Sequence, residues 1–180
     1  MKKVGLLFAM VGAVLMLTTN VMAQGTGTQE STLTVNEVAL IDGTGTVIMN
    51  LDAAIAGNAV AVAPVIGYVK VSSVVAFEQT RTITASIGAL PAGSALTIAT
   101  AVPANANFGG AVGTGSAAQA ITNVDGDIIL ATAIGSCYTG TGATDGYQLT
   151  YSWTPVQADY ADFVATSTSV PVTLTITAGL

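Results

Sequence analysis

The 180-residue sequence contains no histidine and a single cysteine, Cys137. Zinc, copper and haem sites depend largely on these two residue types, and nucleophilic triads need a histidine base or a substitute for it. We therefore expect that this chain binds no cofactor and is not an enzyme. A lone cysteine cannot form an internal disulfide, so Cys137, beside an apolar stretch, is expected to be a small buried hydrophobe, with an intermolecular link as the alternative.

Positive charge is also scarce, with four Lys and Arg residues against ten Asp and Glu. Two of the four, Lys2 and Lys3, precede an apolar run over residues 4–17 that is shorter than the roughly 20 residues of a membrane span. A small-residue site ending at Ala23 follows. This order is typical of a cleavable signal peptide, residues 1–23, and an uncleaved anchor is the alternative. We expect secretion through the periplasm to the cell surface or beyond it, with no stable membrane span after cleavage.

The mature chain, residues 24–180, keeps only Lys70 and Arg81 against ten carboxylates, a net charge of about minus eight. Because such a surface cannot neutralise phosphates, the charge argues against nucleic acid and anionic membranes as partners, and it effectively excludes nucleic acid. Its length is that of one ordinary domain with a core of its own.

Abundant Thr, Val and Ala, broken by Gly-containing turns, predict strands rather than helices. Strands are expected over 31–41 with a phase reversal at Glu37, and over 46–51, 68–77, 80–87, 95–101, 120–124, 127–134, 147–153 and 168–178. Residues 103–118 and 136–146 are expected to be Gly-rich loops, and 158–163 a short helical turn. The fold class is therefore all-β, an antiparallel two-sheet sandwich of immunoglobulin-like type, with a jelly roll as the alternative.

The most regular strand places Tyr147, Leu149, Tyr151 and Trp153 on one face. We expect this face in the core, with Trp153 at the centre of an aromatic cluster. A sugar-stacking platform formed by these rings together with Tyr68 and Tyr138 is the less favoured interpretation.

Three groups of carboxylates invite a ligand hypothesis. Calcium is a weak possibility at Asp125 and Asp127, and Asp145-Gly146 offers similar chemistry, but Asp-Gly is also ordinary turn chemistry, which we favour. Asp159 and Asp162 with Glu78 could form the carboxylate pair of a glycoside hydrolase, although aspartates in such a turn more often cap backbone amides.

The mature N-terminus is the most informative segment: a polar lead, residues 24–30, runs directly into the alternating Ser31–Val35, and the chain ends on the similar Val172–Thr177. With the signal peptide and the low-charge composition, these segments resemble the exported sandwich subunits of bacterial fimbriae and of related spore-coat and biofilm-matrix fibres. The resemblance implies a structural subunit of an extracellular filament, pilus or surface layer that self-associates by strand exchange. Residues 24–41 would be the donor strand, through Leu33, Val35, Glu37, Ala39 and Ile41.

A different function class fits the same composition. A secreted monomeric binding or adhesion module would use the two Gly-rich loops, 103–118 and 136–146, to hold a glycan or a protein ligand.

Overall fold

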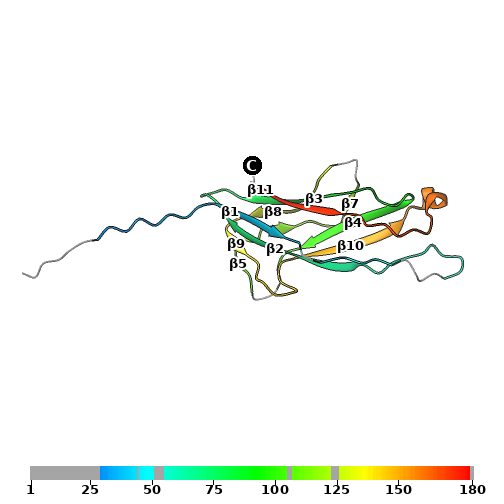
Figure 1. Ribbon diagram of the computed structural model, residues 1–180, viewed down its shortest axis with the longest axis horizontal. Coiled ribbons are helices and arrows are strands. Elements are labelled where there is room, and N and C mark those ends of the chain that lie inside the picture. The colour runs from blue at the N-terminus through cyan, green and yellow to red at the C-terminus, as the bar shows by residue number, and fades with distance from the viewer. Residues whose placement is uncertain (1–28, 44, 51–54, 105–106, 123–125, 179–180) are drawn as a thin grey trace, which may run out of the picture. The chain divides into compact units, whose positions relative to one another are not determined.

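The computed structural model describes residues 29–43, 45–50, 55–104, 107–122 and 126–178 (Figure 1). The predicted signal peptide, residues 1–23, therefore lies outside the described residues. The chain divides into two units, Met1–Thr34 and Val35–Leu180. In the first, residues 29–34 carry no regular secondary structure. The second holds every strand described below.

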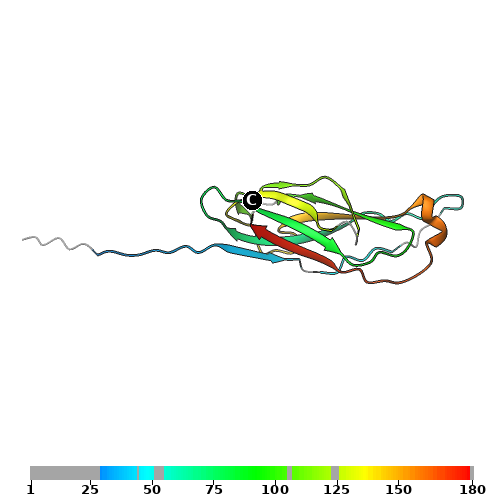
Figure 2. The same ribbon diagram turned by 90° about the horizontal axis from the view of Figure 1, so that it is seen from above.

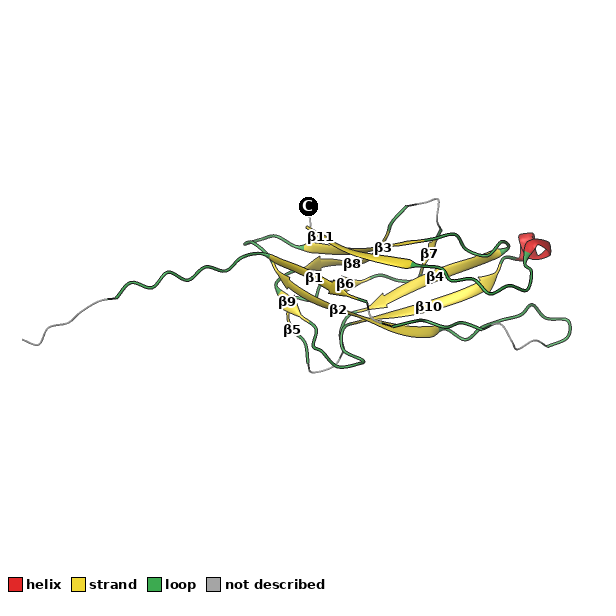
Figure 3. Cartoon of the chain, viewed as in Figure 1, coloured by secondary structure: helices red, strands yellow, loops and turns green. Residues whose placement is uncertain are grey.

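The described part of Val35–Leu180 forms two antiparallel sheets packed as a sandwich, which confirms the prediction of an all-β, two-sheet sandwich (Figure 3). The seven-stranded sheet has the order β5-β9-β2-β10-β4-β7, with β1 also pairing with β2, and the four-stranded sheet has the order β11-β3-β8-β6. The elements are β1 Val38–Asp42, β2 Val65–Val74, β3 Arg81–Ile87, β4 Ser94–Ala101, β5 Gly109–Gly110, β6 Thr114–Gly115, β7 Gln119–Ile121, β8 Ile128–Ile134, β9 Cys137–Tyr138, β10 Tyr147–Pro155, a short 3-10 helix η1 Gln157–Asp162, and β11 Val172–Ala178.

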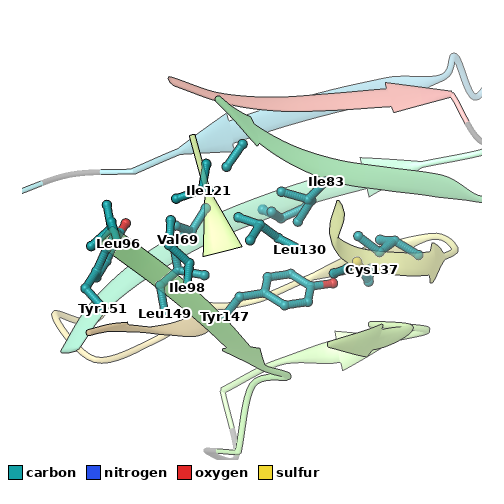
Figure 4. Packing of buried hydrophobic residues seen from close by; sticks show 14 residues of the cluster. Val69, Ile83, Leu96, Ile98, Ile121, Leu130, Cys137, Tyr147, Leu149 and Tyr151 are labelled. Carbon is teal, nitrogen blue, oxygen red and sulfur yellow. The ribbon is translucent and has the colours of Figure 1, made fainter. Parts of the chain in front are cut away.

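Strand β10 shows why the sequence folds this way. Tyr147, Leu149 and Tyr151 are buried, while Gln148 and Thr150 between them are only partly buried on the outer face. The buried face meets apolar side chains of both sheets (Figure 4). The core consists of Val69, Val71, Ile83, Ala85, Leu96, Ile98, Ile121, Leu130, Ala131, Ile134, Cys137, Tyr147, Leu149 and Tyr151.

The expected aromatic centre at Trp153 is wrong in detail. Tyr147 is the fully buried aromatic side chain, at 0% exposure, whereas Trp153 is only partly buried. Trp153 lies two residues before the end of β10 and packs edge-on against Phe163, with ring centroids 6.0 Å apart. It therefore closes one end of the core, where the chain turns into η1 at the position predicted for a helical turn.

Several predicted strands are shorter than expected. Within 31–41 only Val38–Asp42 pairs, and the last strand begins at Val172 rather than at residue 168. Residues 46–50 form no strand, and residues 51 and 123–124 lie outside the described residues. Val47 is nevertheless partly buried, and Ile48 is exposed. The Cγ2 atom of Val47 lies 3.4 Å from the point that a Cβ atom would occupy if Gly67 had a side chain. The alternation of apolar and polar residues thus predicted which side chains of this segment face inward. It did not predict whether the backbone would pair with a neighbouring strand.

The ladders of the larger sheet are interrupted at one level, and two loop segments leave the sheet there. Strand β2 pairs with β9 through Ser73 and Ser72, and with β10 from Val69 onward, in the same antiparallel direction. Between these two ladders, Lys70 and Val71 of β2 face residues 139–146, which form an excursion between β9 and β10. The excursion stays attached at its start, where the N–H of Thr139 donates a hydrogen bond to the Val71 carbonyl oxygen at 3.1 Å. On the other side, β10 pairs with β4 up to Ala101 and β9 pairs with β5 from Gly109. The described residues between them, 102–104 and 107–108, therefore lie outside the ladder, and we call this segment the 102–108 excursion.

Candidate functional site

The five predicted donor residues occupy three different environments. Leu33 and Val35 lie outside any strand and are 90% and 81% exposed. Ala39 and Ile41 belong to β1, opposite Ser73 and Val71 of β2, and Ile41 packs partly buried against the core.

Glu37, the fifth residue, is held by an ion pair. Its Oε2 accepts a hydrogen bond from Arg81 Nη2 at 3.1 Å, and the same Nη2 lies 3.2 Å from the carbonyl oxygen of Val74. The Arg81 side chain is 8% exposed and that of Glu37 57%. Arg81 begins β3 of the smaller sheet, whereas Glu37 immediately precedes β1 of the larger one, so the pair ties the two sheets together.

Arg81 is the functional candidate that sequence reasoning missed. A buried guanidinium is destabilising unless its charge is compensated, and Arg81 Nε has no hydrogen-bond partner within the described residues. The signal was present, because Arg81 and Lys70 are the only cations after residue 23. The sequence gives no indication that Arg81 pairs with Glu37, which lies 44 positions away in the chain.

Strand β1 is loosely built into the sandwich. Its ladder is with β2 alone, from Val38 opposite Val74 to Asp42 opposite Lys70. Its other side runs beside β11 without a described ladder between them (Figure 2). Three of its five residues are exposed. Residues 43–64, which connect β1 to β2, contain no strand in their described part.

A second candidate is the surface where the two excursions meet. The carboxylate of Asp145 accepts the N–H of Gly142 at 2.7 Å and the side-chain amide of Asn107 at 3.1 Å. These hydrogen bonds, that of Gly142 above all, hold the pKa of Asp145 below its usual value, because they favour the ionised form. Asp145 therefore connects the 139–146 excursion to the 102–108 excursion.

Two open depressions flank this connection. The first, of about 310 Å³, is lined by Tyr68, Val102, Ala104, Thr144, Gly146 and Gln148. The second, of about 700 Å³, is lined by Asn107, Tyr138, Gly140, Thr141, Gly142 and Asp145. Tyr138 is exposed and lies over Gly109, where a Cβ atom would come within 2.6 Å of its ring. Of the five aromatic residues considered for a sugar platform, only Tyr68 and Tyr138 line this surface.

The remaining carboxylate candidates do not come together. Glu78 precedes the start of β3, whereas the backbone of Asp159 lies against Gly93, beyond the end of the same strand. Asp127 accepts a hydrogen bond from Thr84 Oγ1 at 3.3 Å, and Asp125 lies outside the described residues. Within the described ranges, no three His, Cys, Asp or Glu side chains are grouped closely enough to hold a metal ion.

Comparison with known proteins identifies no relative: no family model matches the chain, and neither a curated protein nor a solved structure does. Among the described residues there is also no helix with the length and hydropathy that a membrane crossing requires. The fold alone defines the class of this protein, an antiparallel two-sheet β-sandwich.

Proposed function

We propose that this chain is a secreted structural subunit of an extracellular filament, pilus or surface layer, assembled by exchange of its N-terminal strand between copies. It performs no catalysis in this role. The observation that carries the proposal is the continuity between the exposed, alternating segment with Leu33 and Val35 and strand β1, which pairs on the edge of β2.

The N-terminal segment has unused capacity for strand pairing. Leu33 and Val35 alternate with Thr32 and Thr34, the pattern of a strand with one apolar face, yet residues 29–37 belong to no described strand. Exposed apolar side chains and unpaired backbone groups favour addition to a sheet edge, where backbone bonds provide affinity and alternate side chains provide register. A signal peptide, predicted for residues 1–23, would export the chain across the inner membrane, which an assembly at the cell surface requires.

Electron microscopy of negatively stained protein, isolated from the cell surface after signal cleavage, tests the proposal together with a gel run without boiling. We expect filaments or layers and a ladder that resists detergent. Monodisperse single domains would overturn the proposal.

A matched pair of variants tests the apolar face. Leu33→Lys with Val35→Lys should abolish assembly and leave the melting temperature of the monomer unchanged, because both side chains are exposed. Thr32→Lys with Thr34→Lys adds the same charge to the opposite face and should still assemble. Equal assembly by both variants would show that this face does not make the subunit contact.

The converging excursions favour a second candidate function, a monomeric module that binds glycans. Tyr68 and Tyr138 provide ring faces for stacking, and Asn107 and Asp145 provide an amide and a carboxylate beside them. A glycan array tests this function with the wild type and Tyr138→Ala, and Tyr160→Ala on η1 is the control. Binding lost only in Tyr138→Ala would support it, and an array without signal would contradict it.

A further inference from the structure

We propose that Arg81 and the Lys70–Val74 edge of β2 form an acceptor site for Glu37 and β1 of a second copy of this chain. This inference rests on the proposed strand exchange and specifies its geometry. Each contact that β1 makes within its own chain would be made between copies in the assembly. The described structure is then the closed form, in which the subunit fills its own acceptor.

The first support is that β1 can be separated from the fold. Of its residues, only Val38 and Ile41 are partly buried, and neither belongs to the fully buried core. Residues 43–64 connect it to β2 without a strand in their described part, which leaves a long connection that could span two subunits. A terminal element joined by a long connection can be exchanged between identical chains at low cost, because the same contacts form again.

The second support is the charge of Arg81. If β1 leaves, the guanidinium stays at the start of β3, and of the two Nη2 contacts within the described residues only that to the Val74 carbonyl oxygen remains. A buried cation without a carboxylate is strongly unfavourable, so an open acceptor selects a strand that carries an acidic residue at the right position. Glu37 of an incoming copy meets that requirement, since the same residue pairs with Arg81 at 3.1 Å in the closed form.

The third support is register. With Glu37 on Arg81, Ile41 lies opposite the buried Val71 and packs partly buried against the core, while Ala39 lies opposite Ser73 on the same side of the strand and is exposed. A shift by one residue would turn Ile41 outward and bring Leu40 and Asp42 to the inner face. The ion pair would therefore select both the partner and its alignment.

Engineered disulfides test the acceptor directly. Leu40 and Ser72 are exposed and lie opposite each other in the β1–β2 ladder, so Leu40→Cys with Ser72→Cys is introduced into a Cys137→Ser background. Assembled material is oxidised, denatured and separated without reducing agent. We expect a covalent ladder, whereas Leu40→Cys with Ala120→Cys on the distant edge strand β7 should give none.

The outcomes separate this inference from the proposed function. Filaments whose engineered disulfides between positions 40 and 72 all lie within single chains would leave the filament function standing and overturn the acceptor site. A ladder equally strong with the Ala120→Cys control would also overturn it. If the Cys137→Ser parent forms no filaments, the proposed function fails first.

Charge exchange gives a second readout. Glu37→Arg alone and Arg81→Glu alone should each reduce assembly at least tenfold, because like charges then meet at the acceptor. An equimolar mixture of the two should restore filaments that contain both chains, since each donor meets an opposite charge on the other variant. The double variant in one chain should assemble by itself. If the double variant assembles and the mixture does not, the exchange between copies is contradicted.

Discussion

The side-chain amide nitrogen of Asn107 lies 3.1 Å from Oδ1 of Asp145, which joins two parts of the chain 38 residues apart. The same carboxylate holds the N–H of Gly142. One side chain thereby stabilises both excursions beside the two depressions, and its ionisation state affects their structure.

Acid should therefore loosen this surface. The pKa of Asp145 is lowered in the folded chain, so its ionised form adds stability above the unfolded-state pKa of about 4, and that stability is lost as pH falls through the lower folded value. Asp145→Asn should be less stable than wild type at pH 7 and lose less further stability on acidification. Thermal unfolding between about pH 7 and pH 2 measures both effects. Parallel stability curves for the two proteins would contradict this prediction.

Removing the hydroxyl of Tyr147 should weaken the core without leaving a large cavity. This hydroxyl donates a hydrogen bond to the Val112 carbonyl at 2.6 Å. Tyr147→Phe should lower the free energy of unfolding by about 1 to 3 kcal/mol, because a carbonyl in a partly buried contact loses its donor. Urea denaturation measures the change, and Tyr160→Phe on η1 is the control that should unfold like wild type.

The same tyrosine should make the protein sensitive to alkali. Burial raises the pKa of Tyr147, and also that of Tyr151. The folded state thus holds these protons more tightly than the unfolded state, so stability is intact below about pH 10 and falls as pH rises above that value. Tyr147→Phe should show a shallower loss between about pH 9 and pH 12. An identical alkaline decline in both proteins would rule out this role for Tyr147.

Two glycines with nearly the same backbone conformation should respond differently to alanine. Gly146 has φ +113° and Gly45 has φ +111°, so an added methyl group is strained at both. At Gly146 the new Cβ would also collide with the carbonyl oxygen of Val69, whereas at Gly45 no atom of the described residues beyond its chain neighbours lies within 4 Å of it. Gly146→Ala should lower the unfolding free energy by several kcal/mol, and Gly45→Ala by about 1 kcal/mol. Equal losses in urea denaturation would disprove the predicted collision.

Cys137 should be chemically inert in the native protein. It is 7% exposed, and burial raises the pKa of its thiol, so little reactive thiolate forms near neutral pH. A coloured thiol reagent should label it slowly under native conditions and at once in denaturant. Rapid native labelling, or dimers on a non-reducing gel, would favour the intermolecular link instead.

Some features of this protein follow from local pattern alone. The period of two in Tyr147, Leu149 and Tyr151 predicted both the strand and its buried face, because side chains alternate in any extended chain. Because helix-forming residues are scarce and turns are frequent, the sequence also predicted a β-sandwich. The alternation of Leu33 and Val35 predicted an apolar face in the same way, but not whether a partner strand would meet it.

Residues that are neighbours in the chain were thus enough to predict the two-sheet sandwich and the inward faces of strands such as β10. The pairing of Glu37 with Arg81 and of Asn107 with Asp145 became apparent only in the folded structure. Each of these contacts joins residues that are distant in the chain, and each depends on which strands become neighbours and in what register. Hydrophobic periodicity carries no information about that choice, because the backbone groups that form the ladder are the same in every residue except proline.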